Sequence, residues 1–163
     1  MYLEVAKMKN RPFIVRMPDQ SEIEVLGTKF AINAYPDEPA SKATLVEGSI
    51  LLSANVLGQK KETILRPGQQ TLYNHENLTL IPDANVEEAT AFARGFFYFS
   101  KADIRAVARQ LARWYNVEVV YTRPVPVLNF TGKMERSLSL EDVLDILRLN
   151  QVEFTVSGNK IIL

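Results

Sequence analysis

Hydrophobic and polar residues alternate over short runs through the first half of the chain, and a period of two is typical of half-buried β-strands. The runs that show this period, or that are rich in β-branched and aromatic residues, are 13–16, 23–26, 29–35, 43–46, 49–52, 63–65, 70–73 and 78–81. Turn-forming residues such as Gly27, Gly48 and Gly58 separate them. Many short strands at near-regular spacing predict a sandwich, a barrel or a short β-solenoid, and the pattern does not choose among the three.

From residue 96 onward the hydrophobic period changes, and helices alternate with strands. A strand is predicted at 96–99, and apolar residues then recur at helical spacing at Ile104, Val107, Ala108, Leu111 and Tyr115. Ser100 stands three residues before Asp103, which predicts a capping box that opens this helix. Asn116 is expected to end it in the left-handed conformation.

The same order of signals then occurs a second time. Ser139 stands three residues before Asp142, and the helix that they open ends at Asn150. One face of this second helix carries Leu140, Val143, Leu144 and Leu147. Further strands are predicted at 117–121, 128–132, 152–156 and 160–163. A duplicated unit of the βαβ type predicts a compact α+β domain with two helices on one face of a small sheet.

The change of rhythm falls in the polar stretch 82–88, and domain boundaries usually lie in such stretches. We therefore predict two domains, an all-β domain at 1–86 and a small α+β domain at 87–163.

Charge and composition exclude several functions for the 163-residue chain. Lys and Arg together number 19, as do Asp and Glu, so the surplus of positive charge that favours nucleic acid or an anionic membrane is absent. The chain has no cysteine, which excludes disulfides, thiolate catalysis and zinc sites built on cysteine. No apolar run approaches the ~20 residues that span a bilayer. The chain has a single histidine, His75, whereas a multi-histidine metal site needs several, so we expect His75 to be a solvated turn residue.

Catalytic and cofactor-binding motifs are also missing from the sequence, so we predict a non-enzymatic protein with no catalytic, cofactor-binding or metal-ligating residues. Lys101, Arg105, Arg109 and Arg113 recur every four residues. This spacing favours a ridge on the first helix, which is either a docking surface for an acidic partner or an ordinary solvated face. Trp114 is either a recognition anchor or part of the packing at the end of the helix.

Several strings carry a family resemblance. In the first half, 24–30, 33–35, 44–49 and 65–70 resemble the FecR family of bacterial transmembrane anti-sigma factors. In the second half, 95–99, 111–117, 130–133, 139–144 and 161–163 resemble the small C-terminal domain of Bacteroidetes members of that family. That domain is similar to the short N-terminal signalling domain of secretins and TonB-dependent transporters.

This resemblance implies the periplasmic sensor region of an anti-sigma factor that is anchored in the inner membrane. The expected partner is the N-terminal signalling domain of an outer-membrane TonB-dependent transporter. An extracytoplasmic-function sigma factor is reached only through a cytoplasmic part that this chain lacks. The opening strands of the β domain are also expected to be missing, which would leave a free strand edge near 2–6 and favour a homodimer. The alternative is a carbohydrate-binding or cell-surface structural module, because a β architecture alone does not fix function.

Overall fold

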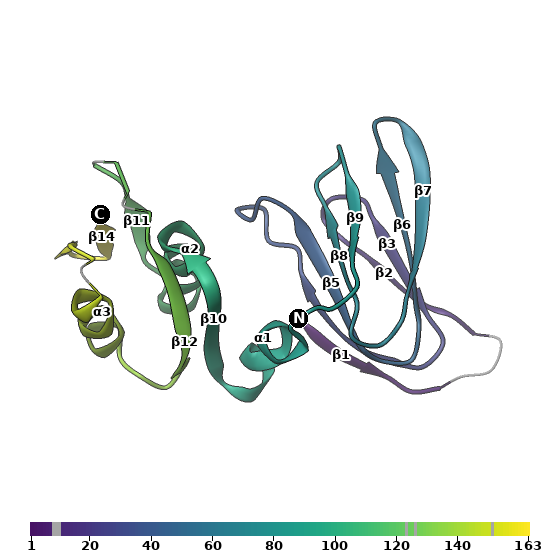
Figure 1. Cartoon of the computed structure of the whole chain (residues 1–163), viewed down its shortest axis with the longest axis horizontal. Helices are drawn as coiled ribbons and strands as arrows, with labels where there is room; N and C mark the ends of the chain where they lie inside the picture. The colour runs from purple at the N-terminus through teal and green to yellow at the C-terminus, as the bar shows by residue number, and fades with distance from the viewer. Residues whose placement is uncertain (8–10, 123, 126, 151) are drawn as a thin grey trace. The chain divides into compact units, whose positions relative to one another are not determined.

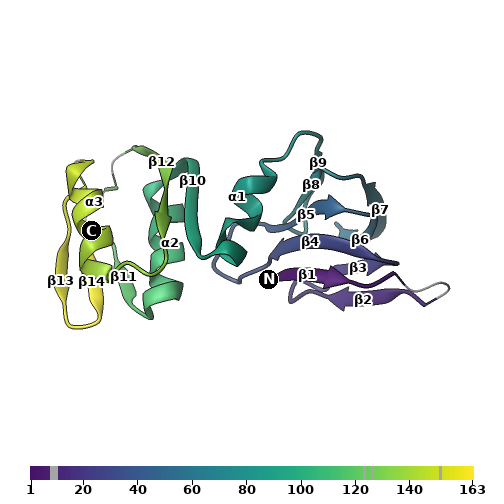
Figure 2. The same cartoon turned by 90° about the horizontal axis from the view of Figure 1, so that it is seen from below.

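A computed structural model describes residues 1–7, 11–122, 124–125, 127–150 and 152–163. These residues form two compact units, Met1–Ala93 and Arg94–Leu163 (Figures 1 and 2). The first unit is built mainly of strands and the second mixes helices with strands. The predicted class, an all-β part followed by an α+β part, is therefore confirmed.

The first unit contains nine strands within the described residues, and all of them except the first overlap a run that the sequence pattern predicted. They are β1 (Tyr2–Val5), β2 (Phe13–Arg16), β3 (Glu22–Val25), β4 (Thr28–Asn33), β5 (Ser41–Glu47), β6 (Ile50–Val56), β7 (Gln59–Leu65), β8 (Gln70–Tyr73) and β9 (Leu78–Ile81). One sheet has the order β1-β4-β5-β8-β9 and the other the order β2-β3-β6-β7. Every pairing in both sheets is antiparallel.

One hydrophobic core lies between these two sheets. Phe30 and Leu45 come from the five-stranded sheet, Ile23, Ile50 and Leu65 come from the four-stranded sheet, and all five are fully buried in the same cluster. Two sheets that share one core form a sandwich, so the structure chooses this architecture among the three that the sequence left open.

Gly27 and Gly48 hold two chain segments closer together than a side chain would allow. Both have a positive φ, 142° and 95° respectively. A Cβ on Gly48 would lie 2.6 Å from the carbonyl oxygen of Gly27, and one on Gly27 would lie 2.7 Å from Cα of Lys7. Glycine is therefore needed at both positions for space as well as for backbone conformation.

The division between the units lies later than the predicted boundary at 86/87. Helix α1 (Val86–Thr90) contacts β5, and the N–H of Ala84 donates to the carbonyl of Gly68 at 2.8 Å. Ala91, in the 3₁₀ turn η1 (Ala91–Arg94), is buried. The polar stretch and α1 thus belong to the first unit, because the short helix packs against its sheet.

The second unit divides its strands between two sheets instead of the single sheet that the βα repeat suggested. Its elements are β10 (Phe96–Asp103), α2 (Ile104–Tyr115), β11 (Glu118–Val120), β12 (Asn129–Glu135), α3 (Leu140–Leu149), β13 (Thr155–Ser157) and β14 (Lys160–Ile162). The strands that precede the helices, β10 and β12, pair with each other and are antiparallel. Of the strands that follow the helices, β14 pairs in parallel with β11 and antiparallel with β13.

Both helices bury their predicted apolar faces in one core with residues from both sheets. Phe97 and Phe130 reach this core from the β10-β12 sheet and Ile161 reaches it from the other sheet. The residues buried from the helices are Ile104, Val107, Ala108 and Leu111 of α2, and Val143, Leu144 and Leu147 of α3. The strands before the helices pair only with each other and the strands after the helices join through β14, so two sheets form instead of one.

The ends of the helices follow the predicted signals with one exception. Ser139 and Asp142 form the predicted capping box of α3, and Asn116 ends α2 with φ 53° and ψ 49°. Ser100, however, lies inside β10, and the N-cap of α2 is Asp103, whose Oδ1 accepts the N–H of Ala106 at 2.7 Å. The strand β10 continues past Ser100 through a register shift between Phe99 and Ala102, so the helix begins later than a Ser100 cap would place it.

Candidate docking surface

The basic ridge predicted for α2 is formed by three of its four residues. Arg105, Arg109 and Arg113 lie at four-residue spacing on α2, away from its buried face. Arg105 is exposed, whereas Arg109 and Arg113 are half-buried. Lys101 lies in β10, before the N-cap Asp103, so it does not extend the helical ridge.

Lys101 is nevertheless held in a defined position. It has φ 53°, in the left-handed region, and its N–H donates to Oγ1 of Thr131 at 3.1 Å. A left-handed residue other than glycine costs about 1 kcal/mol, so the neighbouring structure must fix it. The exposed Lys101 is therefore presented from a strained, rigid bulge and not from a helix.

Tyr121 lies beside the ridge and was not foreseen from the sequence. The guanidinium carbon of Arg105 lies 4.5 Å from the centroid of the Tyr121 ring, an arrangement that restrains the long arginine side chain. Burial raises the pKa of Tyr121, and the positive charges of Arg105 and Arg109 partly oppose that rise. Both arginines thus act electrostatically on the same tyrosine, at one end of the ridge.

Trp114 takes part in the packing at the end of the helix, which is one of the two roles that the sequence left open. Its ring is edge-on to Phe97, with centroids 6.3 Å apart, and its Nε1–H donates to the carbonyl of Arg136 at 2.9 Å. The side chain is still 49% exposed. Trp114 therefore packs within the second unit and is also exposed to a partner. Because its indole is already fixed, it would lose little entropy on binding.

Arg136 is a further cation that the sequence reasoning missed. It comes from the turn between β12 and α3, and its guanidinium carbon lies 4.7 Å from the centroid of Phe97 and 4.8 Å from that of Trp114. Its Nε–H donates to the carbonyl of Phe96 at 3.2 Å. No local periodicity marks such a residue, because only tertiary contacts bring it to Trp114.

The second unit as a whole is basic although the chain is neutral. Residues 94–163 contain ten Lys and Arg against seven Asp and Glu, so the first unit carries the compensating acidic surplus. Guanidinium groups bind carboxylates in a two-pronged geometry, and a positive surface attracts an acidic partner over a distance. The α2 side of this unit therefore carries arginine side chains and a half-exposed tryptophan.

The remaining candidates for chemistry form no reactive group. His75 is exposed in the β8–β9 turn, and its Nδ1 lies 3.2 Å from the hydroxyl of Tyr73. Over the described ranges, no three side chains among His, Asp and Glu gather as a metal site requires. None of the helices in those ranges combines the length and apolar character that crossing a bilayer requires.

The described residues thus form a β-sandwich followed by an α+β unit that carries arginines along one helix. Residues 96–163, which make up nearly all of the second unit, match the model of the family described as FecR, C-terminal. No curated protein matched the chain.

Solved structures resemble the chain through both units. Two crystal structures of a putative anti-sigma factor from Parabacteroides distasonis ATCC 8503, at 1.65 and 2.50 Å resolution, each align with a TM-score of 0.80 and 24% identity. Each alignment covers 99% of this chain and 74% of the other chain. The family match agrees with the FecR resemblance drawn from the second half of the sequence, and the solved structures show that the fold of both units is shared.

Proposed function

We propose that this chain is the periplasmic sensor region of a FecR-type transmembrane anti-sigma factor. It relays a signal from an outer-membrane TonB-dependent transporter to an extracytoplasmic-function sigma factor by protein contact, without catalysis. The observation that carries the proposal is the match of residues 96–163 to the FecR C-terminal family. The shared fold with a protein described as an anti-sigma factor supports it across both units.

The contact with the transporter is assigned to the second unit and to the basic side of α2. The exposed Arg105 offers its guanidinium group to carboxylates of the transporter's signalling domain, Arg109 and Arg113 add positive charge along the same helix, and Trp114 supplies apolar area on that helix. Lys101 adds a positive charge from the β10 bulge. The stacking of Arg105 on Tyr121 and the hydrogen bond of Trp114 restrain both side chains before binding. Such restraint reduces the entropy lost in the complex.

Contact with the sigma factor is proposed to be indirect. In the family that the sequence resembles, a cytoplasmic segment binds the sigma factor, and the domains that this chain resembles lie on the other side of the membrane. Occupation of the α2 surface therefore acts on the sigma factor through the remainder of the protein.

A carbohydrate-binding module needs aromatic rings gathered along a groove. The large aromatic side chains that are most exposed within the described ranges are Phe13, Tyr35 and Trp114, on β2, the β4–β5 connection and α2. These rings come from separate elements, so they give that alternative no support.

The proposal is tested by isothermal titration of the chain with a purified N-terminal signalling domain of a TonB-dependent transporter from the same organism. We expect saturable binding that weakens as salt rises, because charges contribute to the contact. Arg105→Glu should weaken binding roughly tenfold, the effect of about 1.4 kcal/mol. The matched control is Lys61→Glu, a charge reversal at an exposed site on β7 of the first unit, and it should bind as the wild type does.

The emission of Trp114, the single tryptophan, checks that the second unit is folded in each variant. The transporter contact is refuted if none of the organism's signalling domains binds. The assignment to α2 is refuted if Arg105→Glu and Lys61→Glu bind equally.

A further inference from the structure

The two helices of the second unit occupy equivalent places in its repeat. Helix α2 follows the N-cap Asp103 and α3 follows the N-cap Ser139, and each helix comes directly after a strand of the β10-β12 sheet or its connection. Residues at the same distance from the two caps are buried in the same core. The buried pairs are Val107 with Val143, Ala108 with Leu144 and Leu111 with Leu147. The two helices can therefore be compared position by position.

The charges at equivalent solvent-facing positions of the two helices are opposite. Arg105 of α2 corresponds to Glu141 of α3, and one turn later Arg109 corresponds to Asp145. Arg105, Glu141 and Asp145 are exposed, and Arg109 is half-buried. A spacing of four residues is about 6 Å along a helix axis, so the two arginines match the two carboxylates in spacing as well as in sign.

Helix stability explains the charges of α3 but not those of α2. Glu141 lies in the first turn of α3 and Arg148 in its last turn, the arrangement that the helix dipole favours. The first turn of α2 has no acidic residue and contains Arg105 instead. A positive charge there opposes the dipole, so Arg105 needs a reason other than the stability of its own helix.

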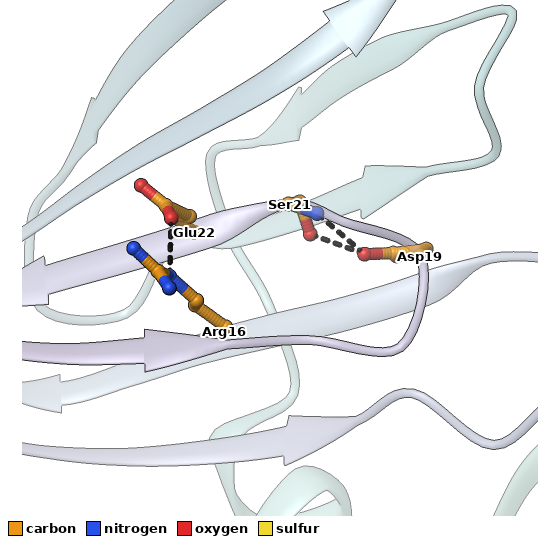
Figure 3. Close-up of polar contacts among 4 residues, drawn as sticks. All are labelled: Arg16, Asp19, Ser21 and Glu22. Carbon is orange, nitrogen blue, oxygen red and sulfur yellow. Dashed lines mark hydrogen bonds and ion pairs between the residues drawn. The ribbon is translucent and has the colours of Figure 1, made fainter.

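Charges in the first unit are paired across neighbouring strands. Nε of Arg16 lies 2.7 Å from Oε1 of Glu22 in the β2–β3 hairpin (Figure 3), and Nζ of Lys29 lies 3.1 Å from Oε2 of Glu47. The second unit instead keeps the two signs on separate helices. In the part of the chain that the structure describes, no ion pair joins the arginines of α2 to the acidic residues of α3, where Asp145 is paired with Arg148 of its own helix.

Each helix also presents an exposed apolar side chain near its C-terminal end. Trp114 on α2 is 49% exposed, and Leu149, one turn after Asp145 on α3, is 85% exposed. If α3 is laid on α2 in the same direction with Glu141 opposite Arg105, Leu149 falls opposite the end of α2 that carries Trp114. The charged pairs and the apolar pair are thus brought together by a single alignment of the two helices.

We propose that the chain associates with a second copy of itself, α3 of one copy docking on α2 of the other. Arg105 and Arg109 pair with Glu141 and Asp145, and Leu149 packs beside Trp114. Docking of α2 on α2, or of α3 on α3, would place like charges opposite each other, which selects the mixed contact. The contact involves this chain alone and does not rest on the transporter, but it covers the same α2 surface, so the two partners would compete.

Sedimentation velocity of the chain over a concentration series tests this proposal. We expect the average mass to rise with concentration, and to rise less at about 1 M salt, where the Debye length falls to about 3 Å. Arg105→Glu and Glu141→Arg should each weaken association roughly tenfold, because each puts like charges face to face. An equimolar mixture of these two variants should associate as the wild type does, since the reversed α2 of one then faces the reversed α3 of the other.

Two further variants complete the test. Lys61→Glu, the matched charge reversal on β7, should associate as the wild type does. Leu149→Ser changes no charge and removes a side chain that the fold leaves exposed, and it should weaken association severalfold. Emission of Trp114 checks the folding of the second unit in each variant, and a misfolded variant would not regain association on mixing.

The proposal is overturned by a chain that stays monomeric at every concentration, or by association that both charge reversals leave unchanged, which would place the contact elsewhere, such as at the β1 edge. A mixture of the two variants that associates no better than either alone would overturn it equally. Because the experiment contains no transporter domain, its result is separate from that of the titration proposed above.

Discussion

Leu111→Ala provides a sharp test of the core of the second unit. Leu111 lies in the third turn of α2, is 1% exposed, and belongs to the cluster that joins both helices to both sheets. The substitution removes three carbon atoms, whose transfer to water costs roughly 2.4 kcal/mol. The cavity left in a fully buried site adds to this, so we expect a loss of about 3–4 kcal/mol.

That loss is a large part of the total, because a unit of this size is stable by roughly 4–10 kcal/mol. Trp114 is the single tryptophan, and it packs edge-on to Phe97 in the same unit. Its emission during urea denaturation therefore reports the second unit separately from the first. Leu149→Ala is the matched control, since Leu149 lies on α3 but is 85% exposed, and it should cost less than about 0.5 kcal/mol. If the two substitutions had the same effect on the free energy of unfolding, the assignment of the helix faces would be wrong.

Four further predictions concern caps, boundaries, ionisation and association. Asp103→Ala should destabilise the second unit by about 1 kcal/mol, because it removes the N-cap of α2, whereas Ser100→Ala should change the stability little. If urea denaturation gave the reverse order, Ser100 would be the cap, as the sequence predicted. Limited trypsin digestion should cut after Arg94 and release a stable fragment that begins at residue 95. Early cuts at other sites, with Arg94 resistant, would contradict the division into two units at this point. Burial raises the pKa of Tyr73 in the folded state above the value of 10.0 that it has in the unfolded chain. The stability that the neutral tyrosine contributes is therefore complete below pH 10.0 and is lost as pH rises through the folded-state pKa. Urea midpoints that stayed constant as pH rises above 10.0 would contradict this prediction. β1 is an edge strand whose Met1 forms a hydrogen-bonded pair with Ile32 of β4. In this register the N–H of Glu4 points away from β4, toward the free edge. Glu4→Pro removes that N–H and should abolish dimers formed through this edge. Light scattering that shows only monomer for the unmodified chain would exclude such dimers.

Local patterns in the sequence were sufficient wherever neighbouring residues decide the structure. The sequence pattern located the strands β2 to β9 of the first unit, because a strand with one buried face places apolar side chains at every second residue. The buried faces of α2 and α3, the Ser139 capping box and the left-handed Asn116 likewise depend on residues within one or two turns of a helix. The FecR resemblance rested on such strings as well, and the family match to residues 96–163 agrees with it.

Contacts between distant residues decided what the sequence left open or placed wrongly. A sandwich forms because of which strands pair with each other. The shared core determines this pairing, and the pattern of any one strand does not. Helix α1 belongs to the first unit because it packs on β5, although its own sequence resembles a linker.

The side chains around α2 show the same limit. Periodicity placed Arg105, Arg109 and Arg113 correctly along α2, but it placed Lys101 on the same helix although this residue lies in β10. Tyr121 and Arg136 come close to side chains of α2 only through folding. The sequence by itself therefore determined the helices and strands and their buried faces, because interactions between neighbouring residues set them. The tertiary structure decided which side chains meet, because only packing brings distant residues together.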